Sequence, residues 1–280
     1  VTEVTIDTLT GENIIERVSS KTKAIFLTHY GGFPIDMDPI IEYCNLNKIQ
    51  IFEDSACSVR SFYKGNACGT LGNYGVWSFD AMKTLSTVDG GMIFVKDEEI
   101  RRQAEKYLYL GLPLKSKSGL DNSSDNDKWW EFDLELPGRR AIMNNVTASI
   151  GLNQLKKIDF YINRRKEIFD FYQENLNDIA DLKNPEIPQF DFKSSYYFYW
   201  IQTKKRNELA NFLLSQKIYT TFRYYPLHLT SLYKKYSDER FLNNTKFIFE
   251  NTLNIPAHHN LTNDDLHYIV ECIRQFFKKN

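Results

Sequence analysis

The sequence predicts an α/β fold with a mostly parallel sheet, because short apolar runs alternate with helical patterns through its first 100 residues. The apolar runs are nearly continuous, as they are in strands that are buried on both faces. A chain of 280 residues is long enough for one large domain or two ordinary ones. We therefore expect a large α/β domain in residues 1–150 and a smaller α+β domain in residues 151–280.

Four strands and one helix are predicted in the first part of the chain. The strands are KAIFLTH (23–29), IQIFED (49–54), GVWSF (75–79) and GMIFV (91–95). After a turn at GGFP (31–34), Asp38 is the expected N-cap of a helix that has Pro39 at its first position. One face of that helix is predicted from the spacing of Met37, Ile40, Ile41 and Cys44.

The second half begins with a long predicted loop, 113–138, which carries Trp129 and Trp130 and has a length typical of functional or mobile loops. A long helix that bridges the two domains should follow. One stripe along it, at helical spacing, is formed by Ile158, Tyr161, Ile162, Arg165, Ile168, Phe169 and Tyr172. Further predicted elements are strands at 196–202 and 218–225, a helix near 207–216, and a last helix that starts at a capping box from Thr262 to Asp265.

Composition excludes several classes of function. The 35 basic and 36 acidic residues give a net charge of -1, which favours neither nucleic acid nor an anionic membrane as a partner. No apolar run approaches the ~18–20 residues that a membrane span needs. The four cysteines form no CxxC, and His258 and His259 lack metal ligands at suitable spacing, so we expect no metal. These features indicate a reduced, cytoplasmic protein.

Three polar residues are candidates for chemistry. Asp54 ends one predicted strand, Lys83 follows another, and Ser78 stands five residues before Lys83. Ligands of open α/β sheets bind at the carboxyl ends of strands, so these side chains could share one crevice. A lysine can form a Schiff base, a carboxylate can pair with a pyridinium nitrogen, and a serine can bind phosphate. The set meets the needs of pyridoxal phosphate (PLP), although each residue alone is more often a strand cap or a solvated surface group.

The sequence resembles the DegT/DnrJ/EryC1/StrS family of sugar aminotransferases, which are PLP enzymes of fold type I. Six blocks carry the resemblance in family order: THYGGFPIDMDPI, IFEDSACS, KGNACGTLGNYGVWSFDAMKTLSTVDGGMI, MNNVTASIGLNQL, YTTFRYYPLH and LNIPAHHNLTNDD. The resemblance implies an aspartate-aminotransferase-like large domain and a smaller C-terminal domain. Chains of this family extend further at the N-terminus, so we expect the N-terminal part of the large domain to be missing.

The resemblance also implies roles for five residues. Lys83 would hold PLP and move protons, Asp54 would pair with the ring nitrogen, and Ser78 would bind the phosphate. Cys57 stands where the family often has a Gln near the ring hydroxyl, and a thiol is a weaker hydrogen-bond partner. Arg140, in GRRAIM, stands where the family has an Asn that reaches the phosphate of a neighbouring subunit, which implies a homodimer. A solvated basic pair before a helix is the alternative interpretation of Arg139 and Arg140.

The implied activity is PLP-dependent transamination of a keto group on a nucleotide-linked sugar, with glutamate as the amino donor. His228 and Tyr225, in YYPLH, would bind the substrate, with packing as the alternative for the tyrosine. A non-catalytic or dehydratase-like homologue that binds a nucleotide-sugar is the alternative function. The related dehydratases replace the lysine with His, so Lys83 favours transamination. A sugar-binding or glycosyltransferase module without PLP has less support, because no GxGxxG opens a helix.

Overall fold

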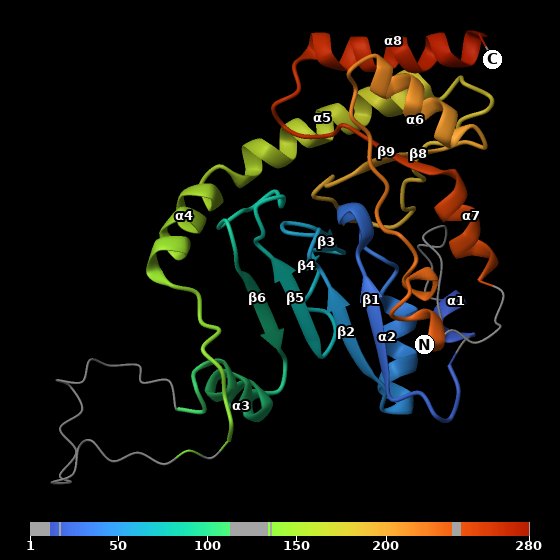
Figure 1. The fold of residues 1–280 in the computed structure, drawn as a ribbon. Helices are drawn as coiled ribbons and strands as arrows, with labels where there is room; N and C mark the ends of the chain where they lie inside the picture. The colour runs from blue at the N-terminus through green and yellow to red at the C-terminus, as the bar shows by residue number, and fades with distance from the viewer. Residues whose placement is uncertain (1–11, 17, 113–133, 135, 237–241, 280) are drawn as a thin grey trace, which may run out of the picture.

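A computed structural model describes residues 12–16, 18–112, 134, 136–236 and 242–279 (Figure 1). The predicted loop at 113–138 lies almost wholly outside these ranges, and so do Trp129 and Trp130. Within the described ranges, no helix has both the length and the apolar character that crossing a membrane would require.

A four-stranded sheet in the order β1-β2-β5-β6 forms the centre of the N-terminal half. Strands β1 (Ala24–Thr28), β2 (Gln50–Asp54) and β5 (Tyr74–Ser78) are parallel, and β6 (Gly91–Val95) is antiparallel to β5. These four strands agree with the predicted ones to within a residue at each end. The predicted mostly parallel α/β architecture is therefore confirmed.

Helix α2 (Asp38–Asn47) packs against the sheet with its predicted apolar face, in which Met37, Ile40 and Cys44 are buried. Its N-cap is Met37, so the prediction of Asp38 as the N-cap is wrong by one residue. The reason is that the Asp38 carboxylate accepts a hydrogen bond from Lys64 Nζ at 2.5 Å instead of turning back to the helix backbone. Helix α1 (Glu12–Ile15) contacts α2 near the N-terminus.

The two faces of the sheet differ in what covers them. Side chains alternate along a strand, so Ile51 and Glu53 of β2 point to the buried α2 side and Phe52 to the other side. On that other side, the rings of Phe26, Phe52 and Tyr74 stack across three neighbouring strands, with centroids 4.5 and 4.4 Å apart. Phe26 is 78% exposed, so this face of the sheet is open in the structure.

Alternation also places two candidate site residues on the open face. Asp54 lies two positions after Phe52 on β2, and Ser78 lies four positions after Tyr74 on β5. Both residues are the last of their parallel strands, so they share the carboxyl edge of the sheet. The fold therefore brings the predicted carboxylate and hydroxyl to one edge and one face.

The C-terminal half is built on helices around a two-stranded antiparallel sheet of β8 (Tyr199–Gln202) and β9 (Thr252–Ile255). Two helices precede this part in the chain: α3 (Glu98–Leu108), which follows β6, and α4 (Asn145–Leu155). The helices of the C-terminal half are the predicted long helix α5 (Ile158–Leu176), α6 (Arg206–Ser215), α7 (Asn243–Asn251) and α8 (Asn263–Lys279). The capping box is confirmed, because Thr262 N donates to Asp265 Oδ2 at 2.8 Å and Asp265 N donates to Thr262 Oγ1 at 3.1 Å. The predicted strand at 218–225 is wrong: only Thr221 forms a bridge, with Asn254.

Contacts join the two halves at several points. A small sheet pairs β3 (Phe62–Tyr63) with β4 (Asn66–Ala67) on one side and with β7 (Phe192–Lys193) on the other. Phe33 belongs to the same buried cluster as α5, α6 and α8. Helix α5 runs from α4, beside β6, to its packing site under α8 (Figure 1). The predicted domain boundary between residues 150 and 151 stays a prediction.

Candidate active site

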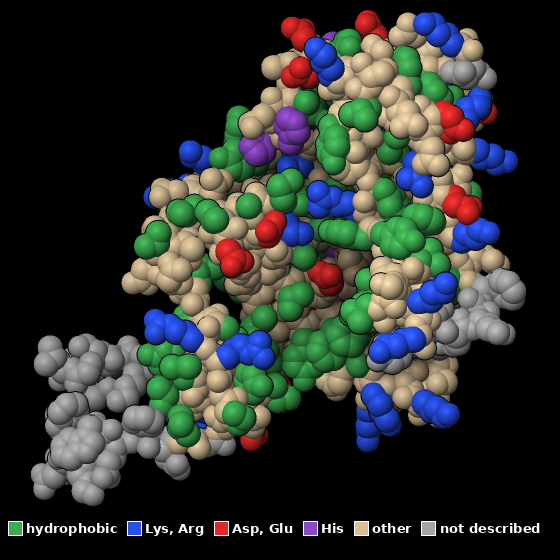
Figure 2. Space-filling view, in the orientation of Figure 1, with side chains coloured by type: hydrophobic (Ala, Val, Ile, Leu, Met, Phe, Trp, Pro, Cys, Tyr) green, Lys and Arg blue, Asp and Glu red, His purple; other side chains and the backbone are tan. Residues whose placement is uncertain are grey.

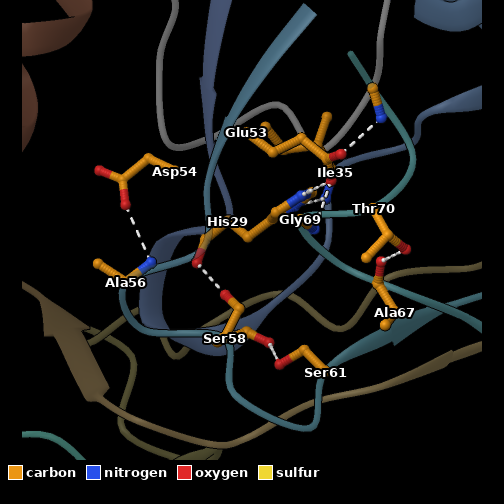
Figure 3. A network of polar contacts seen from close by, with 12 residues as sticks. His29, Ile35, Glu53, Asp54, Ala56, Ser58, Ser61, Ala67, Gly69 and Thr70 are labelled. Carbon is orange, nitrogen blue, oxygen red and sulfur yellow. Dashed lines mark hydrogen bonds and ion pairs between the residues drawn. The ribbon is translucent and has the colours of Figure 1, made fainter. Parts of the chain in front are cut away.

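A fully buried carboxylate, Glu53, organises the end of β2 (Figure 3). Its Oε2 accepts hydrogen bonds from His29 Nε2 at 2.9 Å and from Gly69 N at 2.7 Å, and its Oε1 accepts one from Gly72 N at 2.6 Å. His29 Nδ1 accepts a hydrogen bond from Ile35 N at 3.2 Å, which assigns the ring proton to Nε2 in a neutral imidazole. Burial opposes the charge of Glu53, but these donors outweigh it and lower the pKa of the carboxyl.

Fixing Glu53 on the buried side directs Asp54 to the open side of the sheet. The backbone oxygen of Asp54 accepts a hydrogen bond from His29 N at 3.1 Å. Its carboxylate Oδ1 accepts one from Ala56 N at 2.9 Å, which starts the loop after β2, and the residue is exposed (Figure 3). Ser58 Oγ donates to His29 O at 2.9 Å, and this bond fixes the same loop to the residue that follows β1. The Asp54 carboxylate therefore stands open at the sheet edge on a loop that is tied to the buried His29–Glu53 pair.

Lys83 follows β5 in a turn that its own backbone closes, because Lys83 N donates to Asp80 O at 2.9 Å. Its side chain is half-buried, with Nζ 3.7 Å from Cys57 Sγ and 5.1 Å from the centre of the Tyr197 ring. In the part of the chain that the structure describes, no carboxylate lies within ion-pair distance of this amine. The amine is thus held beside weak partners only, which leaves its lone pair available for reaction with a carbonyl once it is deprotonated.

Cys57 connects Lys83 with Asp54. Burial raises the pKa of the Cys57 thiol, the charge of Lys83 opposes that rise, and the charge of Asp54 adds to it. The thiol therefore stays protonated at neutral pH. The structure brings Asp54, Cys57 and Lys83 together as a cluster at the carboxyl edge of the sheet.

A segment from the C-terminal half completes this cluster, and nothing in the local sequence pattern had indicated it. Ser195 Oγ donates to Cys57 O at 2.5 Å, and Ser195 N donates to Ser61 Oγ at 3.0 Å. Two residues further on, Tyr197 OH donates to Met82 O at 2.9 Å, next to Lys83. These contacts fix the loop after β2 and the turn after β5 against one another.

Arg223 is a second residue that the sequence did not single out. Its backbone oxygen accepts a hydrogen bond from Tyr30 OH, and its backbone N donates to Asn254 Oδ1 at 3.1 Å. The guanidinium carbon lies 5.5 Å from the centre of the Phe198 ring. Arg223 is thereby anchored on the side of the site that the C-terminal half provides.

The remaining predicted site residues occupy different places. Ser78 Oγ lies 3.4 Å from Asp80 N, whose hydrogen bond it accepts, at the edge shared with Asp54. Arg140 is exposed and forms an isolated bridge with Tyr109 just after α3, and α3 lies at the end of the sheet opposite to the carboxyl ends of β2 and β5 (Figure 1). Arg140 is therefore not part of the Lys83 cluster within its own chain.

The two predicted substrate residues lie beyond Arg223. Tyr225 is 52% exposed and packs its ring against Phe249, with centroids 5.2 Å apart. His228 lies in the short 3-10 helix η3 (Leu227–Leu229) and is half-buried. Figure 2 shows a hollow on the face in view, between the sheet and the C-terminal helices, with basic, acidic and apolar side chains around it. No group of three or more metal-ligating side chains occurs among the described residues.

Comparison with known proteins gives this arrangement a family. The sequence model described as the DegT/DnrJ/EryC1/StrS aminotransferase family matches residues 3–274. The chain belongs to this family. The resemblance noted in the sequence is thereby confirmed.

Individual relatives agree with this membership. The chain is 39% identical over 225 residues to dTDP-4-dehydro-2,3,6-trideoxy-D-glucose 4-aminotransferase of Saccharopolyspora spinosa. The matched region covers 80% of this chain and 58% of that relative. The crystal structure of the aminotransferase TlmJ from Streptoalloteichus hindustanus matches with a TM-score of 0.86 and 38% identity, over 98% of this chain and 72% of that one. The PMP form of Spr1654 from Streptococcus pneumoniae matches with a TM-score of 0.84 and 25% identity, over 99% of this chain and 76% of that one. The predicted aminotransferase fold is therefore confirmed for this DegT/DnrJ/EryC1/StrS family member.

Proposed function

We propose that the protein is a PLP-dependent aminotransferase that converts a keto group on a nucleotide-linked sugar to an amine, with glutamate as the amino donor. The observation that carries the proposal is the amine of Lys83, 3.7 Å from Cys57 Sγ at the carboxyl edge of the sheet that also bears Asp54 and Ser78. Family membership supports it, and the Saccharopolyspora relative is named for amino transfer to a dTDP-linked 4-dehydro sugar.

The residues present fit PLP. A primary amine, a carboxylate and a hydroxyl lie at one sheet edge and match the aldehyde, the ring nitrogen and the phosphate of the cofactor. When bound, PLP supplies a conjugated ring that stabilises the electron pair left when a C–H bond next to nitrogen breaks. Asp54 would hold a proton on the ring nitrogen by its charge, and Ser78 would donate a hydrogen bond to the phosphate.

Lys83 would act as both base and acid in the proposed reaction. Its Nζ would accept the proton from the donor carbon that bears the nitrogen and would return it to the carbon on the other side of that nitrogen. This is the 1,3-proton shift that transamination requires. The Tyr197 ring and the Cys57 thiol lie against the amine and would limit its directions of approach. The thiol would stand beside the ring hydroxyl as a weak donor.

We also propose a homodimer in the cytoplasm, with Arg140 of one subunit reaching the cofactor phosphate in its partner's site. The position of Arg140 away from Lys83 in its own chain supports a role across subunits. His228 and Tyr225 would contact the nucleotide-sugar, since they follow closely after Arg223, which lies over Phe198 next to Tyr197 and Lys83. The binding of a nucleotide-sugar and of glutamate requires neither nucleic acid nor a membrane.

An absorption and labelling experiment tests the proposed function. The purified protein, incubated with PLP, should gain a visible absorption band that glutamate bleaches and a keto nucleotide-sugar restores. Borohydride reduction and peptide mapping should place the pyridoxyl label on Lys83. Lys83→Ala should lose the label while keeping its fold, because a half-buried loop lysine contributes little packing. A label on Lys64 or Lys96, with Lys83 unmodified, would contradict the assignment.

A further inference from the structure

Three cationic groups surround one pair of aromatic rings in the site. The rings of Tyr197 and Phe198 are adjacent, with centroids 4.4 Å apart. Lys83 Nζ lies 5.1 Å and Arg165 Cζ lies 5.6 Å from the centre of the Tyr197 ring. Arg223 Cζ lies 5.5 Å from the centre of the Phe198 ring. This concentration of positive charge attracts an anionic ligand.

Arg165 already has a structural role. Its Nη1 donates to Tyr197 O at 3.1 Å and to Ala257 O at 2.7 Å, and the residue is 7% exposed. Burial lowers the pKa of its guanidinium to about 10. Arg165 thus holds the backbone that carries Tyr197, and it has little surface to offer a ligand.

Arg223 differs from Arg165 because, within the described ranges, its backbone and not its guanidinium makes the hydrogen bonds. Tyr30 OH and Asn254 Oδ1 fix the main chain on both sides of the residue. Among the described residues, no carboxylate lies within ion-pair distance of the guanidinium, which rests against Phe198. A half-buried charge without a counter-ion is unfavourable, so this fork-shaped group is available for an anion.

The adjacent rings place the guanidinium and Lys83 in one cluster, because Lys83 lies over Tyr197 and Arg223 lies over Phe198. Burial raises the pKa of the Cys57 thiol, and the charge of Arg223 is near enough to oppose that rise, as the charge of Lys83 does. Burial likewise raises the pKa of Tyr197 to about 12, again against the charge of Arg223. Arg223 and Lys83 therefore both act on the Cys57 thiol, and they come from the two halves of the molecule.

We propose that Arg223 binds the carboxylate of the amino-acid donor, an inference that rests on the proposed transaminase function. An α-amino acid carries its carboxylate on the carbon that bears the reacting nitrogen. A donor whose nitrogen reaches the Lys83 position must therefore place that carboxylate among the side chains around Lys83. A guanidinium pairs with a carboxylate through two parallel hydrogen bonds, which also orients the donor carbon. The phosphates of a nucleotide-sugar are separated from the reacting carbon by the sugar ring, so they fit this position less well.

The proposal is tested on the PLP-loaded protein by measuring absorbance changes in two half-reactions, one with the amino donor and one with the nucleotide-sugar. In Arg223→Gln, the concentration of L-glutamate needed for half-maximal conversion should rise about tenfold or more, while cofactor content and the visible band stay unchanged. The response to 4-aminobutyrate, which lacks an α-carboxylate, should not change between wild type and variant. Arg223→Lys should recover part of the loss, because it restores the charge without the fork.

Controls distinguish a carboxylate from a phosphate as the anion that Arg223 binds, and they distinguish the role of Arg223 from the proposed function. Arg206→Gln is the matched variant, since the Arg206 guanidinium also lies over a ring, Phe222, but donates to the backbone oxygen of Phe249. It should behave as wild type. An unchanged glutamate response in Arg223→Gln overturns the inference. So does a loss confined to the nucleotide-sugar half-reaction, which would make the anion a phosphate, and so does an equal loss with glutamate and 4-aminobutyrate.

Binding without chemistry keeps the inference independent of turnover. Succinate, a dicarboxylate without an amino group, should bind the wild-type protein measurably by calorimetry and about tenfold more weakly to Arg223→Gln. If wild type fails to convert glutamate, the proposed function fails, and succinate binding still decides the role of Arg223. Equal succinate affinity in wild type and Arg223→Gln would refute that role.

Discussion

His29 Nε2 donates a 2.9 Å hydrogen bond to Glu53 Oε2, and both side chains are completely buried. Glu53 directly precedes the exposed Asp54 in the sequence. Glu53 lies on β2, and its carboxylate accepts from His29, which follows β1, and from the backbone N–H groups of Gly69 and Gly72. The carboxylate therefore ties the ends of two strands to the turn before β5. The geometry of Asp54 at the sheet edge therefore depends on a neighbouring residue that faces the opposite side. This dependence makes Glu53 a test of how the site is supported.

Glu53→Gln should destabilise the protein by about 2–4 kcal/mol. Both oxygens of Glu53 accept hydrogen bonds from N–H donors, so the NH₂ of a glutamine would face a donor on one side. Urea unfolding measured at neutral pH gives the loss directly. Glu98→Gln is the control: Glu98 is exposed, its ion pair with Arg101 is on the surface, and the change should cost less than about 1 kcal/mol. Equal losses in the two variants would refute the special role of Glu53.

The stabilising effect of Glu53 should disappear in acid. Its folded-state pKa is lowered by His29 and the two backbone donors against the effect of burial, so its contribution is present above the unfolded pKa of about 4.3 and is lost as the pH falls through the folded value. The difference in unfolding free energy between wild type and Glu53→Gln should be constant near neutral pH and shrink below about pH 4. A difference that stays constant down to acid unfolding would show that packing, not charge, explains the variant.

Asp54→Asn should reduce the rate of transamination about a hundred- to a thousandfold and affect cofactor content much less. An amide has no charge with which to hold a proton on the ring nitrogen, whereas it can still accept the hydrogen bond from Ala56 N that shapes the loop. Steady-state rates and the absorbance of bound cofactor, measured on the same sample, separate the two effects. Turnover close to wild type would reduce Asp54 to a strand-end residue.

The strands of the sheet could be predicted well because they are continuous apolar runs. The segment around Arg223 was wrongly predicted to be a strand. Thr221, Phe222 and Tyr225 are residue types that favour strands, yet only Thr221 pairs with another strand. Phe222 and Tyr225 pack their rings on Phe249 instead, so tertiary contacts override the local preference. The segment is therefore irregular, and the irregular backbone turns Arg223 towards Phe198.

In the candidate site, too, residues could be predicted where a local sequence pattern marks them, but contacts between residues far apart in the sequence could not. Asp54 and Lys83 could be proposed from the sequence because each follows a predicted parallel strand. The contact of Ser195 with Cys57 joins residues 138 positions apart, and no local pattern encodes such a pairing. The role of Arg223 is likewise visible only once Tyr30 and Asn254 are seen to hold its backbone.

Cys57 should be the cysteine that iodoacetamide labels first, and the labelling should be slow at neutral pH. Burial raises the pKa of the half-buried thiol, so little thiolate exists at pH 7 and the rate should increase steadily with pH. The other three cysteines are buried more deeply: Cys44, Cys68 and Cys272. Bound PLP should protect Cys57, because the cofactor would cover the space beside Lys83. Peptide mapping with and without PLP checks both points, and labelling of Cys57 that PLP does not slow would contradict the proposed cofactor position.

Subunit complementation should reveal whether Arg140 acts in its partner's site. Arg140→Ala should weaken PLP binding without moving the attachment from Lys83, because the exposed guanidinium would neutralise a phosphate across the interface. Mixed with Lys83→Ala under conditions that allow subunit exchange, it should regain part of the lost activity. One site of each heterodimer would then combine an intact Lys83 with an intact Arg140, while the other site would lack both. If heterodimers form and the mixture stays as inactive as the two parents, Arg140 acts within its own subunit or has no part in the site.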